Sequence, residues 1–158
     1  MSIERVPITP DGYEKLKKEL ENLIRVERPS VIKAIEEARA FGDLSENAEY
    51  DAAKEKQSFV EGRIQELESK LSRAEVIDPK SITNKERVTF GLTVKMEDLD
   101  TGEEVTYQLV GPDETEPENG KISITSPIGR AMLGKQVDED VTVTTPGGIR
   151  EFEVLDIL

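Results

Sequence analysis

The sequence predicts two domains: an all-α antiparallel coiled-coil hairpin, followed by an α+β domain with an antiparallel sheet and one short helix. Three observations support this fold class. Apolar residues recur at alternating steps of three and four up to about residue 78, which is the spacing of a coiled-coil helix. Beyond that point they alternate with polar residues, as in half-buried strands. Pro79 lies between the two patterns and ends any helix there, so we expect domains of residues 1–78 and 79–158.

The first predicted helix begins with a clear set of start signals. Thr9 is a good N-cap residue, Pro10 suits the first helical position, and Asp11 places a carboxylate in the first turn, where the helix dipole favours it. The apolar positions of this helix are Tyr13, Leu16, Leu20, Leu23, Val31, Ile35 and Ala38. Those of the second helix are Tyr50, Ala53, Val60, Ile64, Leu67, Leu71 and Ala74, with Gln57 on the same stripe.

The two apolar stripes match each other in reverse order, which predicts an antiparallel pair. Leu16 with Leu71, Leu23 with Ile64, and Ile35 with Ala53 have residue numbers with a nearly constant sum, as a hairpin folded near Gly42 requires. Glycine suits the end of the first helix because it adopts positive φ. Pro29 breaks the helical pattern, and we expect a kink or a restart at Ser30.

The second domain reads as short strands and one helix. Alternating apolar residues predict strands over 88–96, 105–109, 122–124, 141–143 and 152–154, with turns at 100–102 and 146–148. Ser126 and Pro127 form an N-cap and a first helical position, and Gly134 is a stop signal, so we expect a helix over 127–133. The acidic segment 111–120 is predicted to be one long loop.

Composition excludes several classes of protein. The 158 residues contain no Cys, His or Trp, which removes disulfides, Cys/His zinc sites and imidazole catalysis, so any metal must be a hard cation held by carboxylates. The 34 acidic and 21 basic residues give a net charge of −13, which repels phosphate, and no tight autonomous binding to nucleic acid is expected. The chain has neither a signal-peptide core nor a long apolar run, so we expect a soluble cytoplasmic protein without membrane association.

The expected hairpin tip carries two carboxylates, Asp43 and Glu46. They have the spacing of a capping box at the start of the second helix. The spacing favours capping, but a role in holding Mg²⁺ is compatible with it, since a helix N-terminus keeps carboxylates ionised, and two ligands would leave most of an octahedral shell for a partner to fill. Both interpretations stay open at this point. Phe41 and Leu44 are expected to close the end of the hairpin.

Basic residues near the tip also allow two interpretations. They could form a solvated, salt-bridged helix face, or they could steady a phosphate backbone beside the carboxylates. The residues are Arg39, Lys54, Lys56 and Arg63.

Three separated segments resemble the Gre family of bacterial transcript cleavage factors. They are 42–50 (GDLSENAEY), 126–134 (SPIGRAMLG) and 145–148 (TPGG), and with the order of the elements they extend the resemblance over essentially the whole chain. The resemblance implies an N-terminal coiled coil and a C-terminal domain of FKBP-like topology. It also implies that the globular domain docks at the secondary channel of bacterial RNA polymerase, while the hairpin tip enters the channel.

The resemblance assigns roles to individual residues. The acidic tip pair of the family falls on Asp43 and Glu46, which would help the polymerase hold a second Mg²⁺, a cofactor bound only within the complex. The residues near the nascent RNA 3′ end fall on Arg39 and on Lys54, where many relatives have Arg, so the geometry of a bidentate contact is lost at Lys54.

The docking surface implied by the resemblance includes three consecutive residues, which could also serve only as helix cap and core: Ser126, Pro127 and Ile128.

The expected activity is stimulation of the polymerase's own cleavage of backtracked RNA, which rescues arrested complexes, and the chain is not expected to be an enzyme by itself. The alternatives are a channel-binding inhibitor that acts as a plug, a coiled-coil adaptor, and a prolyl isomerase or peptide-binding module. Aromatic residues for an isomerase pocket are scarce, and fold alone does not establish that function. The plug and the adaptor both predict that the charge of the tip is dispensable.

Overall fold

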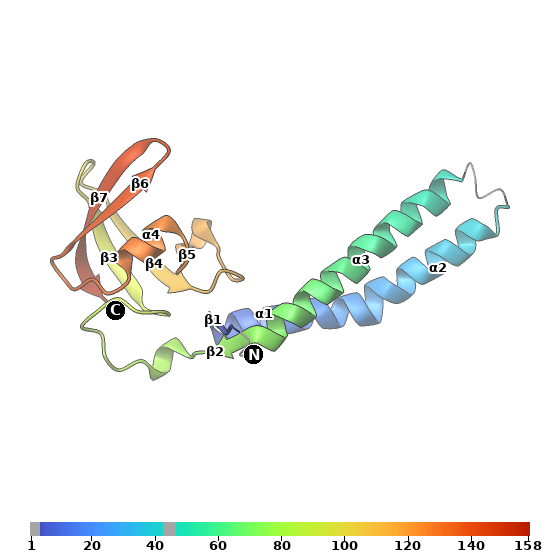
Figure 1. Cartoon of the computed structure of the whole chain (residues 1–158), viewed down its shortest axis with the longest axis horizontal. Coiled ribbons are helices and arrows are strands. Elements are labelled where there is room, and N and C mark those ends of the chain that lie inside the picture. The colour runs from blue at the N-terminus through green and yellow to red at the C-terminus, as the bar shows by residue number, and fades with distance from the viewer. Residues whose placement is uncertain (1–3, 43–46) are drawn as a thin grey trace. The chain divides into compact units, whose positions relative to one another are not determined.

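The structure is a computed structural model that describes residues 4–42 and 47–158. The chain divides into two units (Figure 1): Tyr13–Arg73, and Met1–Gly12 together with Ala74–Leu158. This division differs from the single boundary expected after residue 78, because the N-terminal segment groups with the globular unit. The cause is a short parallel pair between β1 (Val6–Ile8) and β2 (Ala74–Val76), in which Val6 is aligned with Ala74.

The helical unit is the predicted antiparallel hairpin. One arm consists of α1 (Pro10–Asn22), a π-helical turn η1 (Leu23–Glu27) and α2 (Arg28–Arg39), and the other is α3 (Ala48–Arg73). The arms α2 and α3 lie side by side in Figure 1. The residues of the predicted stripes that are buried lie on both arms of the hairpin: Leu16, Leu23, Val31, Ile35, Ala38, Ala53, Val60, Ile64 and Leu67. The predicted start of α1 is also confirmed, because the backbone N–H of Gly12 donates to Thr9 Oγ1 at 3.2 Å.

The helix passes Pro29 through a π-helical turn rather than by breaking at Ser30. The backbone N–H of Arg28 donates to the carbonyl of Leu23, five residues earlier, and α2 begins at Arg28 with the proline in its first turn. Proline has no N–H to donate, and the wide turn of η1 accommodates it while the backbone stays helical at Glu27 and Arg28. The restart predicted at Ser30 is therefore wrong, because a π-helical turn joins α1 to α2 without a break.

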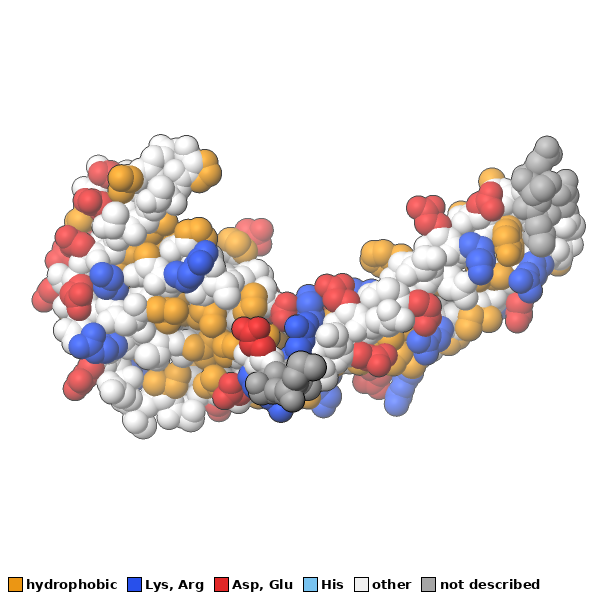
Figure 2. Space-filling model, viewed as in Figure 1, with side chains coloured by type: hydrophobic (Ala, Val, Ile, Leu, Met, Phe, Trp, Pro, Cys, Tyr) orange, Lys and Arg blue, Asp and Glu red, His pale blue; other side chains and the backbone are white. Residues whose placement is uncertain are grey.

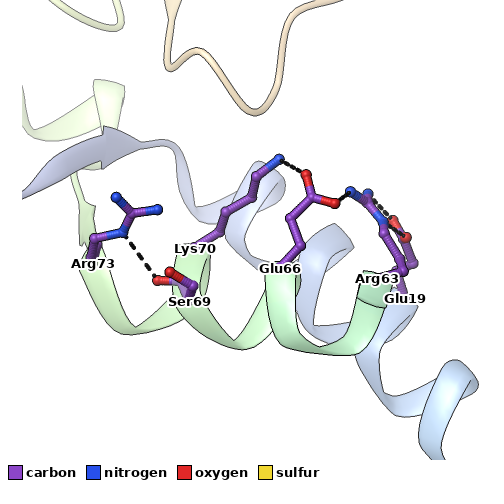
Figure 3. Close-up of polar contacts among 6 residues, drawn as sticks. All are labelled: Glu19, Arg63, Glu66, Ser69, Lys70 and Arg73. Carbon is purple, nitrogen blue, oxygen red and sulfur yellow. Dashed lines mark hydrogen bonds and ion pairs between the residues drawn. The ribbon is translucent and has the colours of Figure 1, made fainter. Parts of the chain in front are cut away.

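Ion pairs join the two arms of the hairpin outside the apolar contact. Arg63 on α3 donates two hydrogen bonds to Glu19 on α1, at 2.5 and 2.9 Å, and also contacts Glu66, which pairs with Lys70 (Figure 3). The hydrogen bond from Arg63 holds the pKa of Glu19 below its ordinary value of 4.5. Acidic and basic side chains are interspersed along the visible face of the hairpin in Figure 2. The prediction of a salt-bridged face is thus right for Arg63.

The globular unit contains a five-stranded sheet of order β5-β4-β3-β7-β6. The strands are β3 (Thr93–Asp98), β4 (Glu104–Val110), β5 (Lys121–Ser123), β6 (Asp140–Thr145) and β7 (Gly148–Ile157). A helix, α4 (Pro127–Met132), contacts β5 and β6. The core comprises Val88, Leu92, Val94, Met96, Leu109, Met132, Val141, Val143, Phe152, Val154 and Ile157. The α+β class and the single short α-helix of this unit are as predicted.

Two details of the sheet were wrongly predicted. The sheet is mixed rather than antiparallel, because β5 runs parallel to β4. The strand expected from Val88 begins only at Thr93, because the chain turns before it and Gly91 adopts a positive φ of 87°. Val88 and Leu92 are nevertheless buried, so their alternation reflects contact with the core and not an extended backbone.

The loop predicted over 111–120 also contains some regular structure. A short 3₁₀ turn, η4 (Pro117–Asn119), lies within it, and Glu116 forms an isolated bridge with Lys121.

The Glu19–Arg63 pair predicts a pH-dependent contribution to stability. A carboxylate whose pKa is lowered by folding stabilises the native state above its unfolded pKa, and this stabilisation is lost as the pH falls through the folded value. We expect Glu19→Gln to lower the melting temperature at pH 7, and the difference from the wild type to shrink as the pH is lowered below 4.5. Thermal unfolding followed by circular dichroism measures both effects. The matched control is Glu36→Gln, an exposed carboxylate on α2. A difference that is constant from pH 7 to pH 3 would contradict the assignment.

Candidate functional site at the hairpin tip

The first arm of the hairpin ends in a tightened turn. The backbone N–H groups of Phe41 and Gly42 donate to carbonyls three residues earlier, at 3.2 Å each, and Gly42 adopts a positive φ of 100°. Positive φ is the conformation for which a glycine was predicted at the end of this helix. The carboxylates predicted next, Asp43 and Glu46, lie outside the described residues, as does Leu44.

Asn47 is the N-cap of α3, and sequence reasoning did not find this role. Its Oδ1 accepts a hydrogen bond from the backbone N–H of Tyr50 at 3.1 Å, and its Nδ2 donates to the carbonyl of Ala38 at 2.7 Å. One side chain therefore caps the second arm and ties it to the last turn of the first. The predicted capping box placed the N-cap four residues earlier, at Asp43, and α3 begins at Ala48 instead. The signal in the sequence was the preference of Asn for N-caps, which Asp shares.

The four basic residues singled out in the sequence separate into two pairs. Lys56 and Arg63 form ion pairs with Glu27 and Glu19 across the hairpin. Arg39 is exposed in the last turn of α2, and Lys54 is exposed on α3, where its Nζ donates to Gln57 Oε1 at 3.1 Å. Neither of these two pairs with a carboxylate among the residues that the structure describes.

Phe41 does not close the end of the hairpin, as the sequence had led us to expect. Its side chain is 73% exposed, and it lines a mostly apolar hollow with Ala34, Ala38 and Ala40. The link across the tip that the structure does describe is the polar one made by Asn47.

The second set of candidate residues lies at the start of α4. Ser126 Oγ accepts from the backbone N–H of Gly129 at 3.1 Å and donates to the carbonyl of Ser123 at 2.6 Å. Pro127 occupies the first turn and is exposed, whereas Ile128 is half-buried against the core. The cap-and-core interpretation is confirmed for Ser126 and Ile128, whereas Pro127 is not part of the core. Pro127 and Ile128 also line an apolar groove of about 310 Å³, whose other lining residues include Tyr107, Val143 and Phe152.

Within residues 4–42 and 47–158, no cluster of three or more acidic side chains could hold a metal ion. None of the helices in those ranges combines the length and apolar composition that a membrane crossing requires.

Two family models together match nearly the whole chain. Residues 6–76 match the N-terminal domain of transcription elongation factors, and residues 83–158 match the C-terminal domain of GreA/GreB transcription elongation factors. The chain belongs to the GreA/GreB family. Both matched regions keep the order expected from the sequence, with the hairpin before the globular part.

Relatives within the GreA/GreB family align over nearly their full lengths. Transcription elongation factor GreA of Thermodesulfovibrio yellowstonii is 60% identical over 98% of this chain and 97% of its own. GreA of Alkalilimnicola ehrlichii is 55% identical, over 98% of each chain. Among solved structures, GreA factor homolog 1 of Thermus thermophilus is 34% identical over 98% of this chain and 99% of its own, with a TM-score of 0.44.

Membership of the GreA/GreB family establishes the activity. The chain is a transcription elongation factor that stimulates cleavage of the transcript by RNA polymerase, and it is not itself the catalyst. GreA factors bind RNA polymerase, so the partner expected from the sequence is confirmed at this level.

The two hydrogen bonds of Asn47 predict separable effects of substitution. Asn47→Ala removes both bonds and should lower the stability of the hairpin by about 1 kcal/mol, as loss of an N-cap does. Asn47→Asp keeps the acceptor for Tyr50 N–H and loses the donor to Ala38. Amide hydrogen exchange should therefore show Tyr50 protected in the Asp variant and exposed in the Ala variant. Equal protection of Tyr50 in both variants would show that another group caps α3.

Proposed function

We propose that this factor delivers Asp43 and Glu46 through the secondary channel of RNA polymerase to the enzyme's active site. There the two carboxylates would complete the coordination of a second Mg²⁺, shared with the polymerase, beside the 3′ end of backtracked RNA. The observation that carries the proposal is the N-cap of α3. Because Asn47 fills this position, α3 does not depend on the acidic pair for its start.

The donor set of this chain suits a metal site that is completed by a partner. Carboxylate oxygens are the ligands that Mg²⁺ prefers, but two of them fill only part of an octahedral shell. Within the described residues no acidic cluster offers a complete site. A second metal at such a centre supplies charge stabilisation and activation of water for cleavage of the phosphodiester bond. The role that we assign to Asp43 and Glu46 is to bind and orient, which agrees with a chain that stimulates cleavage without catalysing it.

Arg39 and Lys54 are proposed to steady the RNA near the tip. Both are exposed, and neither is engaged by a described carboxylate, so their charges are available to a phosphate backbone. Lys54 can act only as a point charge, and its hydrogen bond to Gln57 would have to be released on contact. We therefore expect the larger contribution from Arg39.

Docking on the polymerase is assigned to the globular domain, residues 79–158 of the predicted division. Ser126, Pro127 and Ile128 are the proposed contact residues. The exposed Pro127 and the apolar groove that it lines with Ile128 support this assignment, because an apolar surface beside a rigid helix start suits a protein partner. The cap made by Ser126 would then act indirectly, by holding the turn in place.

Asp43→Asn and Glu46→Gln, assayed in stalled polymerase complexes, test the metal-binding role. Each variant should reduce RNA cleavage by about 10- to 100-fold and raise the Mg²⁺ concentration needed for half-maximal cleavage, because a ligand is weakened while the shape is kept. Polymerase binding and helical content should be unchanged. Asp51→Asn, the same substitution at an exposed position in the first turn of α3, is the matched control.

Unchanged cleavage by both tip variants would contradict the proposal. It would favour a channel plug if the factor still slows the polymerase, and a coiled-coil adaptor if it does not.

A further inference from the structure

Glu114, in the acidic loop between β4 and β5, makes contacts that neither its charge nor its loop position predicted. Its Oε2 accepts hydrogen bonds from the backbone N–H of Thr9 at 2.8 Å and of Gly111 at 3.0 Å. Its Oε1 accepts a hydrogen bond from the Thr9 hydroxyl. The same Thr9 oxygen accepts from the backbone N–H of Gly12 in the first turn of α1. We call this network of Glu114, Thr9, Gly111 and Gly12 the Glu114 clasp.

The two glycines of the clasp are packed too tightly for a side chain. A Cβ on Gly111 would lie 2.1 Å from the carbonyl oxygen of Pro7, and a Cβ on Gly12 would lie 2.5 Å from Glu114 Oε1. Glycine is less favourable than alanine within a helix, so its presence in α1 indicates a packing requirement. Here that requirement is the approach of the Glu114 side chain.

The clasp lies where the chain leaves the globular unit for the hairpin. Its four residues belong to the globular unit, and the boundary between the two units falls between Gly12 and Tyr13, which are successive residues of α1. The return strand β2 pairs with β1 immediately before the clasp. One side chain therefore orders the first turn of the helix that continues into the hairpin.

We propose that Glu114 is a positioning residue for transcript cleavage. By holding Thr9 and Gly12 within the globular unit, it orders the first turn of the helix that continues into the hairpin. The inference rests on the proposed function, in which the globular unit docks and the hairpin tip acts. A residue of this kind affects the cleavage rate of the bound factor and leaves its affinity for the polymerase unchanged.

Two variants break the clasp by different routes. Glu114→Ala removes the acceptor. Gly12→Ala keeps Glu114 and improves the helix propensity of α1, but it places a methyl group where the carboxylate lies, so the clasp opens without loss of helix stability. Glu118→Ala, which removes an exposed carboxylate from the same loop, is the matched control.

The test measures RNA cleavage in arrested polymerase complexes as a function of factor concentration. For Glu114→Ala and Gly12→Ala we expect a maximal rate reduced on the order of tenfold or more, since small misplacements of reacting groups cost that much. The half-saturating concentration should stay within about twofold of the wild type, as for a group that does not contribute to binding the polymerase. Amide exchange should become faster at Thr9 and Gly111, and Glu118→Ala should match the wild type in every measurement.

Two results would overturn the inference. Faster exchange at Thr9 with a normal maximal rate would show that the clasp only stabilises the unit locally. A raised half-saturating concentration with a normal maximal rate would assign Glu114 to docking. The metal proposal fails in a different measurement, namely unchanged cleavage by Asp43→Asn. In that case the clasp variants can still be compared with Glu118→Ala.

Discussion

The register between the two helical arms is the constraint on which the rest of the hairpin depends. Apolar residues at alternating steps of three and four bury a continuous stripe only if the arms stay aligned from Leu16 to the tip. The π-helical turn before Pro29 keeps this alignment where an abrupt break would have ended it. The ion pair between Arg63 and Glu19 and the hydrogen bond from Asn47 to Ala38 then connect the same two arms at different levels.

The residue types in the chain limit the chemistry that the factor can supply by itself. The chain has no histidine or cysteine, and the carboxylates predicted at the tip are too few to enclose a metal ion. In the proposed account, the factor stimulates cleavage by adding ligands to a centre that another protein supplies. The cap formed by Asn47 matters for this account because it keeps α3 independent of the acidic pair, whose charge can then serve the partner.

Features that depend on neighbouring residues were predicted from the sequence more fully than features that depend on contacts between distant segments. The start of α1 at Thr9 was predictable because an N-cap and a following proline act on their own helix turn. Asp43 and Asn47 are both good N-cap residues, and nothing local distinguishes them, so the start of α3 was misplaced. Val88 and Leu92 have the spacing of strand residues because both side chains are buried in the core, although the chain turns between them. The pairing of β1 with β2 and the contacts of Glu114 with Thr9 each join segments that are far apart in the chain. No pattern within these segments indicates such contacts. The roles of the tip carboxylates stay predictions.

In the proposed function the hairpin tip reaches the metal centre of the polymerase, and local radical cleavage tests this directly. Fe²⁺ loaded in place of Mg²⁺ in an arrested polymerase complex reacts with added hydrogen peroxide to give Fe³⁺, hydroxide and hydroxyl radicals, which cut only protein close to the metal. If the claim is right, this factor is cut in the segment between α2 and α3, and the globular unit is left whole. Cuts confined to the globular unit, or no cuts in a complex shown to contain the factor, would contradict it.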